Sequence, residues 1–368
     1  MHRLDTLLQW AAEGGVNMNG IKPVSIPGRG TGVVAERRIE AGEVVLTVPT
    51  NVMRSLNSVP CSIVQKLPAL WSIHSFLAID LTLNDVAAPW RALLPNLNDF
   101  KDCIPLLWPE QLQALLPRPA IDLVAKQRAK IQSQWKVVHE AFPTMVYHEY
   151  LESWLIINSR TFYHLTPETE KYEWEERLAL LPIADLLNHA ETGCQVLYDA
   201  DEYTLTTAKV YATGEEVNNS YGEHPNDFLL AEYGFILTEN PYDEVCIDDA
   251  ILPHLSEDTT ETLRNMNLMG NWKLQRGHGP CPRTRRVLRL MEHVQRGTWN
   301  NASDDDDASG YPDRTDKTLL HKILIPYASR VAERISDINN LHVGQCNQRE
   351  LLLQRWTQIQ IVLEQMVL

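Results

Sequence analysis

Hydrophobic positions recur at helical spacing in two long stretches of the chain. Between residues 68 and 158, the clearest case is the steps of four, three and four that place Ile131, Trp135, Val138 and Phe142 on one helical face. Prolines from Pro89 to Pro119 divide this region into short helices and turns. At the C-terminus, a similar rhythm predicts one long amphipathic helix that buries Leu352, Trp356, Ile359, Leu363 and Met366.

Two other stretches carry strand signals. Val33–Val34 and Val44–Val45 flank a polar connection that contains Gly42, and Pro49 closes the second strand. Further on, Cys194–Tyr198 and Tyr203–Val210 bracket four polar residues, as in a hairpin. The order is therefore β, helical, β, helical. It predicts an α+β fold, in which a β core of short strands is interrupted by a helical insert and followed by an all-helical C-terminal lobe.

Length and charge narrow the classes of partner. The 368 residues suffice for two or three domains with a real core. The formal net charge is −15, so the whole molecule has no field that attracts phosphate backbones, and we expect neither nucleic-acid binding nor a nucleic-acid partner. The arginines at 283, 285, 286 and 289 lack interleaved aromatics and are more simply a solvated helix face. A Lys-rich protein tail would be drawn in more readily.

Targeting and cysteine patterns point to a reducing compartment. The N-terminal segment lacks the apolar core of a signal peptide, and no run approaches the roughly 20 apolar residues that span a bilayer. The six cysteines are scattered without a CxxC pair, which argues against a zinc site and a disulfide framework. We expect a cytoplasmic or nuclear protein without a membrane partner. Residues 300–314, with four consecutive aspartates, have the composition of a flexible loop.

Four segments hold the candidate functional residues, and each of them also has a purely structural interpretation. Glycines at 28, 30 and 32 allow a close backbone approach to a ligand, or simply form a tight turn; no strand is predicted before them. Arg160 follows an apolar helical run and either reaches a carboxylate or extends to the surface. The segment 180–190 holds Asp185, Asn188 and His189, which are ligand-binding groups or self-satisfied caps.

In the fourth segment, Tyr221 precedes Gly222 after a predicted strand, and Tyr233 precedes Gly234. A phenol at such a turn is either functional or a buried tyrosine with its hydroxyl satisfied. Asp185, His189 and His164 are possible metal ligands, but nothing in their spacing demands a metal, and we predict none. No GxSxG, Walker A or HExxH motif is present.

Taken in order, these segments resemble a SET-domain protein methyltransferase of the Rubisco large-subunit methyltransferase-like class, which includes ribosomal-protein lysine and actin-histidine methyltransferases. The resemblance covers roughly residues 15–240. It rests on four groups of residues: Gly30-Thr31-Gly32-Val33-Val34-Ala35 with Gly42-Glu43 and Val48-Pro49, Trp90 with Leu93-Leu94-Pro95 and Pro105-Leu106-Leu107-Trp108, Leu181-Pro182 through Asn188-His189, and Gly214-Glu215-Glu216 through Tyr221-Gly222, Asn226 and Tyr233-Gly234-Phe235.

The resemblance implies four segments: an N-terminal part of the SET core (15–55), a helical insert (56–165), a catalytic part of the core (166–238) and a helical substrate-binding-like lobe (239–368). It also implies S-adenosylmethionine as the cofactor and a role for each candidate residue. Tyr221 would be catalytic, and Asp185 and Tyr233 would line the substrate side. The cofactor would be held by Arg29, Gly30, Thr31, Arg160, Asn188 and His189.

The resemblance further implies transfer of a methyl group to a lysine of a non-histone protein, with a ribosomal protein or translation factor preferred. The cysteine that many chromatin-type SET enzymes carry two residues after the histidine is absent, since Ala190, Glu191 and Thr192 follow His189. Histidine methylation and a non-catalytic interaction protein remain alternatives. The partner would be a lysine-bearing segment of a protein, and we expect a monomer.

Overall fold

The computed structural model describes residues 2–84, 88–296 and 317–367. Its contacts divide the chain into two compact units. The N-terminal unit comprises Met1–Lys101 and Ala125–Glu223, and the C-terminal unit comprises Asp102–Val124 and His224–Leu368. Residues 102–124 thus cluster with the C-terminal unit although they lie inside the predicted helical insert. The four predicted segment boundaries themselves stay a prediction.

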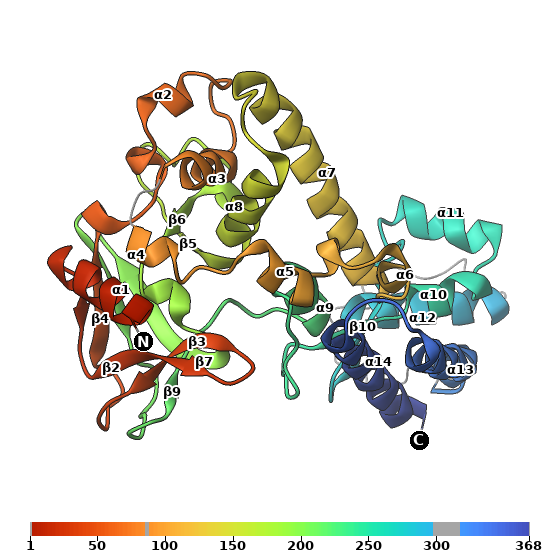
Figure 1. The fold of residues 1–368 in the computed structure, drawn as a ribbon. Helices are drawn as coiled ribbons and strands as arrows, with labels where there is room; N and C mark the ends of the chain where they lie inside the picture. Colours follow the sequence, from red (N-terminus) through yellow and green to blue (C-terminus); the bar gives the residue numbers. More distant parts are fainter. Residues whose placement is uncertain (1, 85–87, 297–316, 368) are drawn as a thin grey trace. The chain divides into compact units, whose positions relative to one another are not determined.

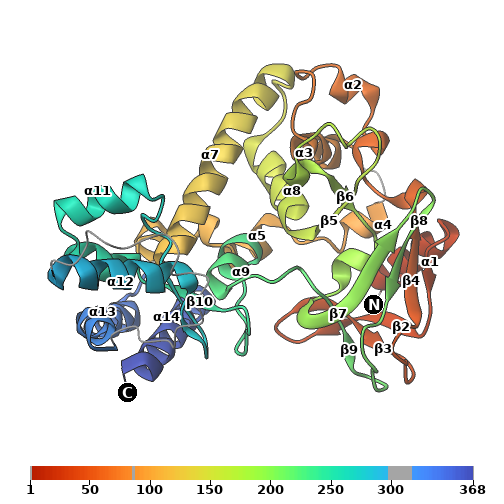
Figure 2. The same cartoon turned by 180° about the vertical axis from the view of Figure 1, so that it is seen from behind.

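The N-terminal unit contains three small antiparallel sheets (Figures 1 and 2). The largest has the strand order β1-β4-β8-β7, and the second has the order β2-β3-β9. The third pairs β5 with β6. The strands are β1 (Asn17–Met18), β2 (Ile21–Ile26), β3 (Gly30–Ala35), β4 (Val44–Pro49), β5 (Thr161–Tyr163), β6 (Leu178–Leu180), β7 (His189–Tyr198), β8 (Glu202–Thr206) and β9 (Glu216–Val217).

The strands form where alternate apolar residues are buried. Along β8, Tyr203 and Leu205 are fully buried while their neighbours are half exposed, which is the period-two pattern of a strand with one covered face. In register, Val48 of β4 faces Tyr203 and Leu46 faces Leu205. Both predicted strand pairs are therefore confirmed as strands, although β8 ends at Thr206 rather than Val210.

One prediction about the glycine cluster is wrong. A strand does precede Gly28, because β2 pairs with β3 from Ile21↔Ala35 to Ile26↔Gly30 and the glycines form the turn of that hairpin. Pro23 and the polar residues of β2 interrupt the alternation of apolar and polar positions by which a strand is predicted. Pro23 is tolerated because β2 is an edge strand of its sheet, where not every residue has to donate a backbone N–H to a neighbouring strand.

The stretch between β4 and β5 is helical, as predicted. In the N-terminal unit, α3 packs against α8 around a buried contact between Ser75 Oγ and Tyr150 Oη, 3.0 Å apart. Glu176 accepts from the backbone N–H of His74 at the start of α3. The helices before β5 are α1 (His2–Glu13), α2 (Cys61–Val64), α3 (Ile73–Leu83), α4 (Ala88–Arg91), α5 (Leu97–Cys103), α6 (Glu110–Gln113), α7 (Arg118–Ala141) and α8 (Tyr147–Arg160).

The C-terminal unit is built on the paired helices α13 and α14 and confirms the predicted C-terminal helix (Figure 1). The all-helical prediction needs one correction, because a three-stranded sheet β10-β11-β12 is present. Its strands have two or three residues, too few for alternation to be visible. The elements are α9 (Asn226–Tyr233), β10 (Glu244–Cys246), α10 (Asp248–Ile251), α11 (Glu257–Asn265), β11 (Lys273–Gln275), β12 (Gly279–Pro280), α12 (Pro282–Arg296), α13 (Lys317–Asn340) and α14 (Cys346–Val367).

A buried ion network ties α14 to the rest of this unit. Arg355 is fully buried, and its Nε lies 2.6 Å from Asp227 Oδ1 while its Nη1 lies 2.8 Å from Asp243 Oδ2. Around it the apolar core includes Trp272, Leu288, Leu352 and Leu363. The predicted flexible loop at 300–314 lies outside the described residues.

Candidate functional site

The site in the N-terminal unit is organised by two chain segments that run side by side. Asn219 N–H donates to Asn188 C=O at 2.9 Å, and Cys194 N–H donates to Asn218 C=O at 2.8 Å. Gly193 permits this approach, since a Cβ there would stand 2.5 Å from the backbone carbon of Asn219. The segment that leads to Tyr221 is thereby fixed against the start of β7.

Tyr221 is held at both its backbone and its hydroxyl. Its N–H donates to His189 Nδ1 at 3.0 Å, and its hydroxyl donates to Leu187 C=O at 2.8 Å. Burial raises the pKa of Tyr221 to about 12, and the nearby Arg160 opposes that rise. The phenol is therefore neutral at physiological pH and has a fixed direction.

Asn188 and Arg29 meet on one carboxylate. Asn188 Nδ2 donates to Glu216 Oε1 at 2.7 Å, and Arg29 Nη1 lies 3.1 Å from Glu216 Oε2. Gly32 lies beneath this contact, where a Cβ would be 2.9 Å from Asn188 Nδ2. The hairpin turn that carries Arg29, Gly30 and Thr31 is thus connected to Asn188 through Glu216.

The two glycines of that turn leave room beside the backbone. Gly28 and Gly30 both have φ of +75°, a conformation that favours glycine. No atom beyond the chain neighbours lies within 4 Å of the place where a Cβ would stand on either residue. The cluster therefore forms the predicted tight turn, and it leaves open space beside the backbone of Gly28 and Gly30.

Arg160 is the last residue of α8 and is half buried. Its Nη1 donates to the backbone C=O of Asp185 at 2.6 Å. Its other N–H groups have no protein acceptor in the part of the chain that the structure describes. Its influence on the pKa of both Asp185 and Tyr221 places its charge close to those two side chains. A guanidinium in this position is ready to receive an anionic group.

Asp185 is a buried carboxyl, only 5% exposed. Its Oδ2 accepts from Trp90 Nε1 at 3.0 Å, while Oδ1 has no hydrogen-bond partner among the described residues. Burial raises its pKa to about 6, against the opposing effect of Arg160. The backbone just before it is strained, because the β-branched Ile183 has φ of +69°.

Hydrogen bonds and charge interactions thus connect the predicted site residues of the N-terminal unit. Tyr233 belongs to the C-terminal unit, where it ends α9 and packs near Phe228 and Phe235, with ring centroids 6.3 and 6.2 Å away. Its predicted place on the substrate side stays a prediction.

Comparison with known proteins identifies the family. A family model described as the SET domain matches residues 30–222, more than half of the chain. The chain belongs to the SET domain family. It is 27% identical to mouse SET domain-containing protein 4 over 64% of this chain and 59% of that protein. It is also 27% identical to mouse N-lysine methyltransferase SETD6, over 72% of this chain and 58% of that protein.

The chain therefore spans less than two thirds of the length of these two curated relatives. Among solved structures, Rubisco LSMT bound to AdoMet is similar with a TM-score of 0.66 and 16% identity, covering 99% of this chain and 90% of that one. This likeness confirms the predicted fold class, a SET-type core followed by a helical lobe.

Three groups in the SET domain site were missed by the sequence reasoning. Glu216 joins Arg29 to Asn188, Trp90 holds Asp185, and the carbonyl of Leu187 receives the Tyr221 hydroxyl. All three lie within segments that carry the resemblance. The only signal for Glu216 was the Glu215-Glu216 pair at the start of β9, and a backbone carbonyl such as that of Leu187 leaves no trace in a sequence.

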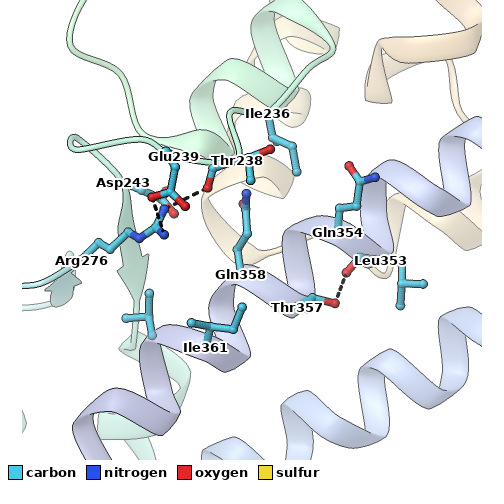
Figure 3. A pocket seen from close by; sticks show the side chains of 11 residues that line it. Ile236, Thr238, Glu239, Asp243, Arg276, Leu353, Gln354, Thr357, Gln358 and Ile361 are labelled. Atoms are coloured by element: carbon cyan, nitrogen blue, oxygen red, sulfur yellow. Dashed lines mark hydrogen bonds and ion pairs between the residues drawn. The ribbon is translucent and has the colours of Figure 1, made fainter. Parts of the chain in front are cut away.

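A separate cavity of about 450 Å³ lies on the C-terminal unit between α14 and the loop before β10 (Figure 3). Arg276 pairs with Glu239 at 2.9 Å and donates to the Thr238 carbonyl at 3.0 Å on one side. Leu353 and Ile361 of α14 line the other side. None of the predicted site residues lines this cavity.

A search of the described residues finds no group of three or more His, Cys, Asp or Glu side chains that could hold a metal ion. Nor does any helix in residues 2–84, 88–296 and 317–367 combine the length and apolar character needed to cross a membrane.

Proposed function

We propose that this chain is an S-adenosylmethionine-dependent protein-lysine N-methyltransferase that acts on a non-histone protein. The observation that carries the proposal is the fixed, neutral hydroxyl of Tyr221 beside the guanidinium of Arg160. The relatives support it: one is named an N-lysine methyltransferase, and a structural neighbour is described as bound to AdoMet.

The residues present fit this cofactor. Arg160 offers N–H groups that have no acceptor among the described residues, and these suit the carboxylate of an amino acid. Open space beside Gly28 and Gly30 lets a ligand approach the backbone at Arg29 to Thr31. Asn188, which precedes His189, is connected to this turn through Glu216, because both Asn188 and Arg29 bond to its carboxylate. When bound, S-adenosylmethionine supplies a methyl group on a positively charged sulfur.

The chain's own contribution is positioning and desolvation. Methyl transfer is an in-line displacement, so a fixed phenol that defines the line of attack accounts for much of the rate. A lysine with an ordinary pKa near 10.4 is less than about 1% neutral at pH 8, so the site must favour the neutral amine. Burial from water does so, because it disfavours the charged form.

Histidine methylation is the nearest alternative, and the pH dependence of the rate separates the two. A histidine acceptor with an ordinary pKa near 6.5 is already neutral at physiological pH. We expect the rate to fall steeply below neutral pH, as a lysine acceptor requires. A rate that stays flat down to about pH 6.5 would favour histidine.

We propose that the substrate is a ribosomal protein or translation factor, and that this chain acts as a monomer in the cytoplasm or nucleus. The free state of all six cysteines agrees with a reducing compartment. The test is transfer of labelled methyl groups from S-adenosylmethionine to fractionated cell extract, with the wild type and Tyr221→Phe in parallel. We expect one labelled protein whose label withstands acid hydrolysis as methyllysine. Equal labelling by Tyr221→Phe, or no labelling by the wild type in any fraction, would contradict the proposal and favour a non-catalytic interaction protein.

A further inference from the structure

A cavity of about 700 Å³ lies in the N-terminal unit at the far ends of two strands that begin at the SET domain site. Strand β7 starts at His189 and ends at Tyr198, which lines the cavity. Strand β5 follows directly after Arg160, and His164, one residue beyond its end, lines the cavity too. None of the residues placed at the methyl-transfer site lines this cavity, so the two are distinct.

His164 places an unused hydrogen-bond acceptor at the cavity. The residue is 5% exposed, and its Nδ1 lies 2.8 Å from the Tyr203 hydroxyl. The Tyr203 hydroxyl donates its hydrogen bond to the Tyr163 carbonyl at 2.8 Å. It can therefore only accept from His164, so Nδ1 carries the proton. The lone pair is then on Nε2, which has no partner among the described residues and is not sealed from the cavity. Burial lowers the pKa of His164, which keeps the ring neutral.

Of the residues that the structure describes, two carboxylates line the same cavity and no lysine or arginine does. Asp199 Oδ1 accepts from the backbone N–H groups of Asp201 and Glu202 at 2.9 and 3.0 Å, which lowers the pKa of its carboxyl. Hydrogen bonds to its own backbone N–H and to Thr166 lower the pKa of Glu168. Both groups are therefore ionised at neutral pH, and the cavity repels anions.

An aromatic surface completes the lining. Tyr198 stacks on the fully buried Tyr203 with ring centroids 4.8 Å apart and an interplanar angle of 13°, while its own ring remains half exposed. Its hydroxyl accepts from Leu165 N–H at 3.2 Å, which fixes the ring. A ring face beside carboxylates and a neutral imidazole acceptor is the environment that attracts an organic cation.

We propose that this cavity, lined by His164, Glu168, Tyr198 and Asp199, binds the guanidinium group of an arginine side chain presented by a protein partner. A guanidinium is planar, stacks on an aromatic face and carries several N–H donors for carboxylates and for a lone pair at Nε2. A lysine ammonium is not planar and does not present several N–H donors in one fixed plane. The site gives this chain a contact with a basic protein, and it does not depend on the methyl-transfer assignment.

The test is isothermal titration of the full chain with the peptide acetyl-Gly-Arg-Gly-amide and with the same peptide carrying citrulline, which has the same shape without the charge. We expect saturable binding of the arginine peptide, at least ten-fold tighter than the citrulline peptide. Glu168→Gln combined with Asp199→Asn should weaken the arginine peptide at least ten-fold. The exposed Glu170→Gln is the control and should change nothing.

Equal binding of the two peptides, absence of binding to folded wild type, or full binding by the double variant would overturn the proposal. Spermidine serves as a further probe, because it carries ammonium groups without a guanidinium. Tighter binding of spermidine than of the arginine peptide would reassign the cavity to a polyamine and also overturn it. Circular dichroism of each variant confirms that the fold is kept, so failure of this inference is distinct from failure of the methyltransferase proposal.

Discussion

At the scale of single residues, the site depends on one hydroxyl whose direction is fixed. Tyr221 donates to Leu187 C=O and cannot ionise at working pH, since burial raises its pKa to about 12. The phenol therefore acts through position and hydrogen bonding rather than as a base. A structural tyrosine would also have its hydroxyl satisfied, so the turnover of a phenylalanine variant separates a transferase from an interaction protein.

Tyr221→Phe should lower the turnover number at least ~100-fold, in the range found when one positioned hydrogen-bond donor is removed from an active site. Affinity for S-adenosylmethionine should stay within about two-fold, because the ring remains. Single-turnover methyl transfer and cofactor titration measure the two quantities separately. Normal turnover by the variant would remove Tyr221 from its proposed role.

Asp185 gives a prediction about stability and pH. Its folded-state pKa of about 6 lies above the ordinary value of 3.8, so the folded protein holds this proton more tightly than the unfolded chain does. The protonated carboxyl's contribution to the free energy of unfolding is fully present below about pH 4. It is lost as the pH rises through about 6, and the total loss is up to about 3 kcal/mol. Asp185→Asn keeps an acceptor for Trp90 and has no such loss.

The free energy of unfolding of Asp185→Asn, relative to wild type, should therefore increase between pH 4 and pH 7. Urea unfolding of the two proteins across that range measures the difference. A difference that does not change with pH would show that the burial of this carboxyl is not what sets its titration.

At the scale of elements, the sequence predicted best where the hydrophobic period was long. The spacing from Leu352 to Met366 predicted α14, and the paired valines predicted β3 and β4. It failed where an element was short or its pattern broken, as in β2, which contains Pro23, and in β10 to β12. Strands of two or three residues are set by their tertiary partners and not by their own periodicity.

The candidate site shows the same division. Residue types and order indicated Tyr221, Arg160, Asn188 and Asp185, but not what holds them. Trp90 lies 95 residues before the Asp185 that it contacts, and Arg29 lies 187 residues before the Glu216 with which it pairs. Local pattern carries no information about such pairings, so the supporting contacts had to come from the structure.

The crossing of Gly193 and residues 218–220 gives an element-scale prediction. A Cβ on Gly193 would stand 2.5 to 2.7 Å from backbone atoms of Asn219 and Ser220, which cannot move aside as a side chain can. Gly193→Ala should therefore displace the segment leading to Tyr221 and lower turnover by at least ten-fold. Gly14→Ala is the control in the same unit, since its Cβ would stand 2.5 Å from a side-chain atom, Val52 Cγ1, and no closer than 3.4 Å to the backbone oxygens of Ala11 and Trp10.

The turnover number and the thermal unfolding temperature are measured for both variants. We expect Gly14→Ala to change stability modestly and to leave the turnover number unchanged. Wild-type turnover by Gly193→Ala would contradict the importance of this crossing.

At the scale of the whole molecule, the C-terminal unit has a buried ion network in its own core. The C-terminal unit contains Arg355, fully buried between Asp227 and Asp243. Arg355→Met removes one cation and leaves two buried carboxylates, which typically costs about 3–5 kcal/mol. Asp227 and Asp243 both belong to the C-terminal unit, so the loss should be confined there.

Hydrogen exchange followed by mass spectrometry measures this loss along the chain. Protection in Arg355→Met should fall in α9, α13 and α14 and remain in β3, β4 and β8. Arg355→Met combined with Asp227→Asn and Asp243→Asn should recover part of the protection. Uniform loss over both units would show that they unfold as one.

The most direct test of the account is isothermal titration of the folded chain with S-adenosylmethionine, in wild type, Arg160→Ala and Arg177→Ala. Arg177 is a matched control, a half-buried arginine of the same unit whose guanidinium already bonds to the carbonyls of Glu170 and Tyr172. We predict one saturable site in wild type and Arg177→Ala, and at least ten-fold weaker binding in Arg160→Ala. No binding to wild type, or equal affinity in all three proteins, would contradict the proposed cofactor site.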